Sequence, residues 1–283
     1  LSPRDIEKWV FPECIYSHLV FIDGHYAPHL SSLDALNDLI TIEPLPSEDK
    51  YSGDDIFSAC NAALHREALH ITIPAHSRLS SPLQLLHLFT DEERYVMPRI
   101  HLSCGESSKA ILVASCGGTA SRSFFNGSIS IDLAPHASLA YNDTAFLSDD
   151  MWYFSSVDVT LAHHAHFYSV DATNGCQALR RSYNVSFTEE HATARLHGMW
   201  SLQNSNHAHT SVRVNHHAAN CSSRQLFKGI LDDTSLSSFS GHIYIPSHAQ
   251  KSDAEQLNKN LLLSDDATAK TAPALEVYAD DVK

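Results

Sequence analysis

The sequence predicts an all-β protein, a parallel β-solenoid whose successive coils stack, and three observations support this prediction. Beyond residue 70, apolar residues alternate with polar ones over short stretches, which is the period of a strand. Each stretch is followed by a polar corner with a small residue, and small residues recur every 26 to 31 residues, as in stacked repeats, at Ala137, Ala165, Ala192, Ala218 and Ala249. Few Asn-Gly or Asp-Gly dipeptides separate the copies, which disfavours the alternative, a β-sandwich of hairpins.

The first 69 residues read differently from the rest. Residues 19–22 are apolar and predict a short strand, which the turn residues Asp23 and Gly24 end. A short helix is expected over residues 33–39, and a longer one over 54–69, where Ser52 or Asp54 can cap apolar residues at helical spacing, namely Ile56, Cys60, Ala63 and Leu64. We therefore divide the chain into an amino-terminal segment with one or two helices, residues 1–69, and a solenoid, residues 70–283.

Charge and composition exclude several classes of function. The 283 residues carry a net charge of −14, which argues against binding DNA or anionic membranes through a broad positive field. No apolar run reaches the roughly 18 residues that suggest a spanning helix. The six cysteines never form a C-x-x-C pair, so no zinc ribbon or iron–sulfur ligand set is indicated, and buried thiols in a cytoplasmic protein are expected.

Histidines recur just before the small corner residue. Stacked coils would place them in a column, about 5 Å apart; they are His76, His136, His164, His191, His217 and His248. Imidazoles at this spacing suit zinc, nickel or copper, so a histidine-ladder metal-binding protein stays open as an alternative. Because a ladder spreads its ligands out, we favour ordinary corner residues and assign no metal site. Charged imidazoles would repel one another, so this edge should loosen below a pH of about 6.5.

Enzymatic chemistry has little support in the sequence. There is no G-x-S-x-G elbow and no phosphate-binding G-x-x-x-x-G-K-[ST] segment. A β-helix polysaccharide hydrolase or lyase remains an alternative, and it would need clustered acids on one face. The adjacent acid pairs instead fall in segments that read as turns, where solvation explains them.

Longer stretches resemble a known family. The segments QLFKGIL, SGHIYIPSHAQKSDAEQLNKNLLLS and APALEVYADDVK resemble the carboxyl-terminal β-helix signature of the SufB/SufD family of iron–sulfur cluster assembly proteins. FSACNAALHREALHITIP, SSPLQLLHLF and LHGMWSLQ favour its SufD branch. Ser252 to Glu255 reads locally as a capping box that opens a helix. The resemblance implies an extended turn of a right-handed parallel β-helix there, and we follow it.

The resemblance also implies a role. Such proteins are non-catalytic scaffolds that pair with a SufB-like protein and a SufC-like ATPase, and the assembled complex, rather than this chain, handles the cluster or its sulfur. The family's cysteine–histidine segment and SufC-binding helices would follow Lys283, so no catalytic or cofactor-binding residue is carried over. The expected partner interface lies in the last coil, and without a partner the same coils are expected to form a homodimer. Its residues are Leu275, Val277, Tyr278, Asp280, Asp281 and Lys283.

Overall fold

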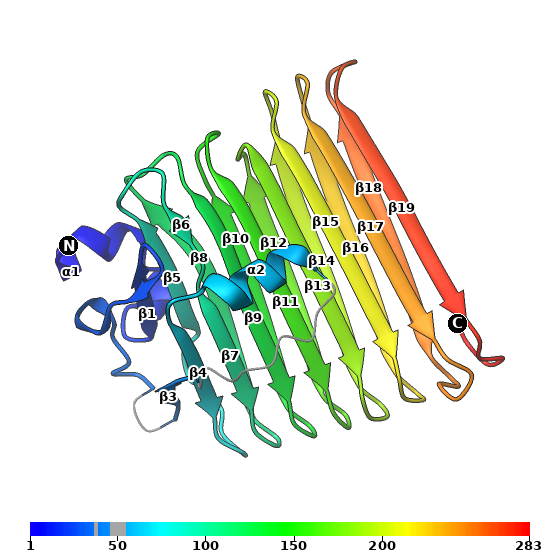
Figure 1. Cartoon of the computed structure of the whole chain (residues 1–283). Helices are drawn as coiled ribbons and strands as arrows, with labels where there is room; N and C mark the ends of the chain where they lie inside the picture. Colours follow the sequence, from blue (N-terminus) through cyan, green and yellow to red (C-terminus); the bar gives the residue numbers. More distant parts are fainter. Residues whose placement is uncertain (37–38, 46–54) are drawn as a thin grey trace.

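Two long β-sheets face each other in the computed structural model of the chain, which describes residues 1–36, 39–45 and 55–283. Even-numbered and odd-numbered strands alternate between the sheets from β7 onward, so each coil contributes one strand to each sheet (Figure 1). Every pairing between successive coils is parallel. The prediction of a parallel β-solenoid is confirmed, at about 7 turns, and the β-sandwich alternative is wrong.

The strand bounds show how regular the coils become toward the carboxyl end. The nine-stranded sheet contains β1 (His18–Ile22), β2 (His25–Tyr26), β5 (Leu83–Phe89), β8 (Lys109–Gly118), β10 (Ser138–Phe146), β12 (His166–Asn174), β14 (Thr193–Leu202), β16 (Ser222–Leu231) and β18 (Asp253–Leu262). The ten-stranded sheet contains β3 (Thr41–Pro44), β4 (Ala68–Ile73), β6 (Tyr95–Val96), β7 (Arg99–Cys104), β9 (Phe124–Leu133), β11 (Trp152–Leu161), β13 (Ala178–Phe187), β15 (His207–His216), β17 (Leu236–Ile245) and β19 (Thr268–Val277).

Alternation along each strand builds the core between the sheets. In β17 every second residue, from Ser237 to Ile245, is buried, and the residues between them are half-buried on the outer face. Parallel register then stacks like positions, so that Ile243 lies between Val214 of β15 and Leu275 of β19. One inward-facing residue is therefore covered by its counterparts in the coils before and after it.

The amino-terminal segment caps one end of the solenoid (Figure 1). It holds two α-helices, α1 (Pro3–Ile6) and α2 (Ile56–Leu64), and three 3₁₀ turns, η1 (Glu7–Trp9), η2 (Pro12–Cys14) and η3 (Pro28–Leu30). The expected strand is confirmed as β1, which pairs with β5 and so starts the nine-stranded sheet. The expected helix over 33–39 is not formed in its described part, where residues 34–36 make a turn; residues 37–38 lie outside the described residues.

The predicted helix over 54–69 is shorter in the structure. Asp55 caps α2 by accepting a hydrogen bond from the Ser58 amide at 3.1 Å, whereas Ser52 and Asp54 lie outside the described residues. The helix ends at Leu64, and the chain is extended again from Ala68. Beyond the helix, Glu67 accepts hydrogen bonds from the Tyr26 amide and from His25 of the first hairpin.

Helix α2 lies on the ten-stranded sheet with its polar side inward. Asn61 donates hydrogen bonds to the carbonyls of Pro98 and Asn126, at 3.0 and 2.7 Å, and Ser58 donates to Ser156 at 2.8 Å. The apolar side that the spacing revealed faces outward, with Ile56 73% exposed. Hydrogen bonds to the sheet, rather than apolar burial of that side, hold the helix in place.

The corners hold a left-handed residue at one fixed place in each coil. Its φ lies between 53° and 64° at His76, Ser107, His136, His164, His191, Asn220 and Lys251. The amides of six of these residues, all but His191, donate to a carbonyl of the neighbouring coil, as when His164 donates to the Glu190 carbonyl at 3.1 Å. The small buried residue that follows is Ala137, Ala165 or Ala192 in the middle coils.

The later corners correct the predicted register. Cys221 and Ser252 follow Ala192 in the column of buried small residues, in place of Ala218 and Ala249. The prediction counted each corner position from the end of the preceding strand, and this count fails because the corners lengthen toward the carboxyl end. Four residues separate β11 from β12, and seven separate β17 from β18. The left-handed residue keeps its distance from the start of the following strand instead.

The local conflict near Ser252 is settled in favour of an extended chain. Residues Asp253–Leu262 form β18, which pairs along its whole length with β16. Ser252 donates its hydroxyl to the Ala249 carbonyl at 2.8 Å, within the corner rather than to a helix. Ten strand hydrogen-bonding positions outweigh one favourable helix cap.

Candidate functional site

The last coil leaves apolar residues uncovered. Leu275 of β19 pairs with Ile243 of β17 and continues its inward-facing column. Ile243 is 3% exposed, whereas Leu275 is 63% exposed, because no coil of the described chain lies beyond it. Tyr278, just after β19, is 62% exposed, and its ring lies 6.0 Å from that of Tyr244. The two edge strands, β18 and β19, thus present both a backbone edge and apolar side chains.

The residues after β19 fold back over the corner before β18. The Asp281 amide donates to the Gln250 side chain at 2.9 Å, and the Lys283 amide donates to the Ser252 carbonyl at 3.0 Å. Lys283 in turn accepts from the Ala254 amide at 2.8 Å. The predicted interface residues therefore gather at one end of the molecule, with Val277 partly buried and the others around it. Whether they bind a partner stays a prediction.

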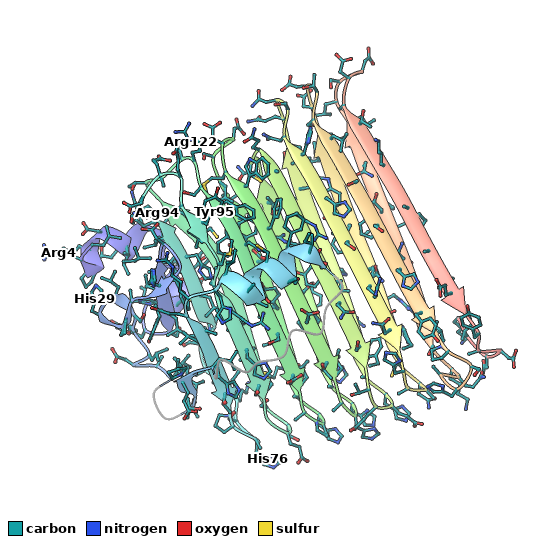
Figure 2. The ribbon with its side chains drawn as sticks, viewed as in Figure 1. Arg4, His29, His76, Arg94, Tyr95 and Arg122 are labelled. Carbon is teal, nitrogen blue, oxygen red and sulfur yellow. The ribbon has the colours of Figure 1, made fainter. Side chains whose placement is uncertain are left out.

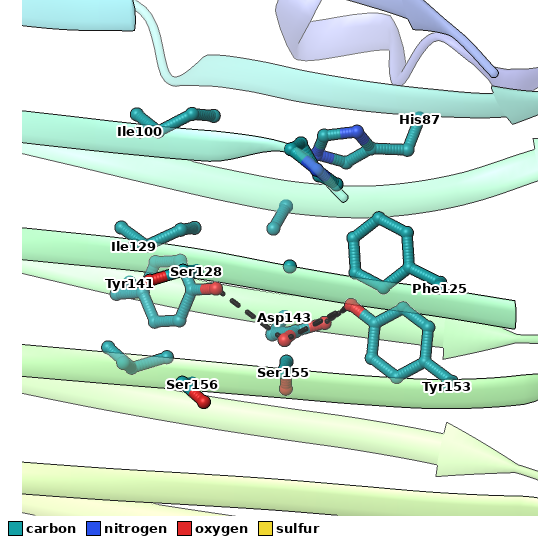
Figure 3. A pocket seen from close by; sticks show the side chains of 14 residues that line it. His87, Ile100, Phe125, Ser128, Ile129, Tyr141, Asp143, Tyr153, Ser155 and Ser156 are labelled. Carbon is teal, nitrogen blue, oxygen red and sulfur yellow. Dashed lines mark hydrogen bonds between the residues drawn. The ribbon is translucent and has the colours of Figure 1, made fainter. Parts of the chain in front are cut away.

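A cluster of charged and phenolic groups lies inside the middle coils. Arg181 of β13 lies 3.1 Å from Asp143 of β10 and 3.7 Å from Asp171 of β12, and these three side chains are at most 3% exposed. The Tyr183 hydroxyl donates to Asp171 at 2.5 Å, and the Tyr153 hydroxyl donates to Asp143 at 3.2 Å. Figure 3 shows Asp143 between Tyr141 and Tyr153. The cluster ties the two sheets together across the core.

Burial and the ion pairs act in opposite directions on the pKa values of this cluster. Burial raises the pKa of Asp171 to about 7, although Arg181 acts in the opposite direction, and it raises the pKa of Asp143 against the same opposition. Burial lowers the pKa of Arg181, but the two carboxylates outweigh it, and the net change in that pKa is upward. One guanidinium thus faces two carboxyl groups, and burial favours the neutral form of both carboxyl groups.

A small cavity adjoins the cluster, with a volume of about 20 Å³. His87, Phe125 and Asp143 are among the residues that line it (Figure 3). The His87 ring stacks on Phe21 at 4.8 Å, and burial lowers its pKa to about 3. A cavity of this size holds about one water molecule and no substrate.

The sequence itself contains a signal for this cluster, namely charged residues at the inward-facing positions of three strands. In β13 the inward positions read Leu179, Arg181, Tyr183, with a cation in the middle of an apolar alternation. In β10 and β12 the inward positions hold Asp143 and Asp171 in the same way. A charged residue at an inward-facing position requires a partner of opposite charge, because an unpaired buried charge is very costly.

The predicted histidine column exists only in part. The rings of His136 and His164 stack at 5.2 Å, and those of His164 and His191 at 4.8 Å, with His163 beside them. His217 and His248 fall outside this stack, because Asn220 and Lys251 occupy the equivalent places. Burial lowers the pKa of His164, and so do the neighbouring imidazoles. In the described ranges no group of three or more His, Cys, Asp or Glu side chains is placed to hold a metal ion.

The thiols are free and most are screened from reaction. Burial raises the pKa of Cys104 and of Cys176 to about 12, and that of Cys14 to about 11. Burial also raises the pKa of Cys116. A thiol must ionise to act as a nucleophile, so these four are poor candidates for carrying sulfur.

Comparison with known proteins connects this architecture to a family. The family model described as the SUF system FeS cluster assembly, SufBD core domain, matches residues 87–283. The chain belongs to the SufBD core family. The predicted family is thereby confirmed, and the match includes both the charged cluster and the last coil.

Curated relatives agree with this assignment. The chain is 29% identical to the iron–sulfur cluster assembly protein SufD of Escherichia coli, over 94% of this chain and 64% of the relative. It is 27% identical to a SufBD family protein of Synechocystis, over 98% of this chain and 66% of the relative. A SufBD family protein of Mycobacterium leprae is 23% identical over 77% of this chain. The chain spans about two thirds of the length of the first two.

No helix among the described residues is both long enough and apolar enough to cross a membrane. The longest, α2, has nine residues.

Proposed function

We propose that this chain is a non-catalytic scaffold subunit of the SUF iron–sulfur cluster assembly machinery, and that its last coil docks a SufB-like partner. The observation that carries the proposal is Leu275, an inward-type residue left 63% exposed where Ile243, one coil earlier, is 3% exposed. A like-folded partner would add its own strands to β18 and β19, and so satisfy their backbone edges and cover Leu275 and Tyr278.

Membership of the SufBD family supports the rest of the assembly. We propose a SufC-like ATPase as the third component, and iron–sulfur clusters or their sulfur as the cargo of the complex rather than a resident cofactor of this chain. A scaffold role is supported by the interior, where the buried carboxylates Asp143 and Asp171 are held by Arg181 instead of facing an open groove. That arrangement disfavours the β-helix hydrolase or lyase. Six free thiols suit a reducing compartment such as the cytoplasm.

Co-purification tests the proposal. The chain, within its complete protein, is co-expressed with the SufB-like and SufC-like proteins of the same organism, and the complex is isolated through a tag on the SufB-like protein. The double variant Leu275→Asp/Tyr278→Asp should abolish capture, because it places charge at the centre of the contact. The matched control is Tyr95→Asp, which changes an aromatic residue that is 78% exposed toward the other end of the solenoid (Figure 2).

Two results would contradict the proposal. Capture of the Leu275→Asp/Tyr278→Asp variant at the wild-type level would remove the last coil from the interface. Absence of any complex with wild-type protein would remove the scaffold role. When the partner is absent, a symmetric homodimer through the same coils is the expected substitute, and light scattering should then find a dimer for the wild type and a monomer for the double variant.

A further inference from the structure

The outer face of the nine-stranded sheet differs in charge from the rest of this acidic protein. Over β14, β16 and β18 it carries four cations, Arg195, Arg224, Lys228 and Lys259, and two acids, Asp253 and Glu255. Both acids bind Arg224, at 2.5 and 3.2 Å. In the part of the chain that the structure describes, the other three cations make no ion pair. This patch is therefore locally positive although the whole chain carries −14.

Apolar side chains lie among these cations. Met199 is 50% exposed on β14, Ile230 is 36% exposed on β16, and Leu261 is 56% exposed on β18. Leu257, also on β18, is 37% exposed and stands beside Leu226. We define the basic-apolar face as ten of the outward-facing side chains on these three strands. They are Arg195, His197, Met199, Arg224, Leu226, Lys228, Ile230, Leu257, Lys259 and Leu261.

Parallel register arranges the face in columns. Met199, Lys228 and Lys259 are paired neighbours along one line across the strands. Ile230 pairs with Leu261 in the line beside it. The two lysines thus stand next to apolar residues on the same strands, about 7 Å away. A surface that mixes positive charge and apolar area at this spacing suits a partner that offers both acidic and apolar side chains.

The opposite sheet provides an internal comparison. On β15 and β17 the outward-facing residues include His209, Ser211, Ser238 and Ser240, and none of the large apolar side chains on those strands is exposed. Part of that sheet is covered by α2, through the hydrogen bonds of Asn61 and Ser58. The outer faces of the two sheets are formed by parallel strands of the same coils. The fold itself therefore does not require the apolar residues on the basic-apolar face.

We propose that the basic-apolar face docks an acidic amphipathic helix of another protein. The strands offer a stretch of about 20 Å from the level of Arg195 to that of Ser201, which matches a helix of about 14 residues. A leucine stripe would cover Met199, Ile230 and Leu261, and flanking carboxylates would pair with Lys228, Lys259 and Arg195. This surface shares β18 with the edge of the last coil but consists of outward-facing side chains, and the proposal does not depend on the scaffold role.

Charge complementarity selects this occupant over others. A nucleic acid would gain from the cations but not from Met199, Ile230 and Leu261, and the net charge of −14 would repel it. A second copy of the chain would bring the same cations into contact, and like charges across an interface disfavour association.

Binding of synthetic peptides to the wild-type protein tests the proposal. The probe is a fluorescein-labelled peptide of about 18 residues with leucine on one helical stripe and glutamate and alanine elsewhere, long enough to present about four turns. The matched probe has lysine in place of every glutamate. Fluorescence anisotropy should show saturable binding of the glutamate peptide to the wild-type protein, weakening between about 50 and 300 mM salt, and no saturable binding of the lysine peptide.

Variants locate the site. Lys228→Glu/Lys259→Glu and, separately, Met199→Glu should each weaken binding of the glutamate peptide at least about tenfold. Lys270→Glu, on the outer face of β19 in the other sheet, is the matched control and should leave binding unchanged. Thermal melts of all variants, followed by circular dichroism, distinguish a folding defect from a binding defect. Because the substituted residues face outward, the variants should have the melting temperature of the wild type.

Several outcomes would overturn the proposal. One is equal binding of both peptides, which would mean unspecific apolar adsorption. Another is wild-type affinity in Lys228→Glu/Lys259→Glu. A third is loss of peptide binding only in Leu275→Asp, which would move the site to the last coil. Dimerisation of the wild type that Met199→Glu abolishes would give the face to a second copy, and binding to anionic vesicles without binding to the glutamate peptide would give it to a membrane.

Discussion

Ile243 and Leu275 occupy the same inward-facing position in consecutive coils of one sheet, yet one is buried and the other is exposed. The sequence pattern around them is alike, and the strands β17 and β19 have the same length. The difference arises from what lies next: Ile243 has a coil on either side, and Leu275 has one. Burial of an inward-facing residue in this fold thus depends on the neighbouring coil.

The largest expected effect breaks the interior of the middle coils. Arg181→Ala should destabilise the chain by about 3–5 kcal/mol, because it leaves Asp143 and Asp171 buried without a cation. Urea unfolding followed by circular dichroism measures the loss. The triple variant Asp143→Asn/Asp171→Asn/Arg181→Met removes all three charges and should recover much of it. A loss below about 1 kcal/mol in Arg181→Ala would show that the cluster does not tie the sheets together.

The second effect compares Ile243 and Leu275, which are paired in neighbouring strands. Ile243→Ala should cost about 2–5 kcal/mol, the range for a fully buried aliphatic side chain. Leu275→Ala should cost less than about 1 kcal/mol in the isolated chain, since most of its surface already meets water. The same urea titrations serve both variants. Equal losses would mean that another molecule, or a second copy, already covers the last coil in solution.

The third effect separates opposing pH dependences inside the core. Burial lowers the pKa of His87 from 6.5 to about 3, so this group destabilises the fold progressively as the pH falls below 6.5. Asp171 acts in reverse: its pKa is raised from 3.8 to about 7, so its unfavourable ionisation is relieved as the pH falls through 7. A tenfold difference in a proton dissociation constant between the folded and the unfolded chain corresponds to about 1.4 kcal/mol of stability.

Two variants resolve these contributions. His87→Phe should gain stability relative to the wild type as the pH is lowered from 6.5 toward 4, by an amount on the order of a few kcal/mol. Asp171→Asn should lose stability relative to the wild type over the same range, because protonation of Asp171 stabilises the folded wild type as the pH falls. Unfolding titrations at stepped pH give both differences. Parallel stability curves for all three proteins would refute this assignment of protons.

The smallest effect concerns the stacked imidazoles at the corner. His164 stands between His136 and His191, and its pKa is lowered by burial and by these neighbours. The neutral form therefore favours the fold, and stability should fall as the pH drops below about 6.5. His164→Gln should raise the melting temperature at pH 5.5 relative to the wild type and leave it unchanged at pH 8. His248→Gln is the matched control, since His248 lies outside the stack.

Particular residues show how far sequence reasoning reached. The solenoid, the strand at residues 19–22 and the extended chain after Ser252 were predicted from alternation, turn residues and family resemblance. The corner register failed at Ala218 and Ala249, because corner length varies and the left-handed residue is placed by the following strand. The predicted length of α2 was also wrong, because the chain leaves the helix after Leu64 and is extended again from Ala68.

The charged cluster shows the other limit. Arg181 could be recognised as an inward-facing cation, but nothing in the chain order indicates that Asp143 of β10 and Asp171 of β12 face it. Parallel register places Asp171 next to Asp143 in one sheet, and Arg181 reaches both from β13 in the facing sheet.

Alternation and repeat length alone determined that the chain winds into stacked coils, because a strand buried on one side must show a period of two and equal coils must return at equal intervals. The tertiary structure alone decided which inward-facing residues are covered, which charges meet and which outer face is left apolar and basic. Those properties depend on neighbours in space, in the adjacent coil or in the facing sheet, and no local pattern along the chain contains them.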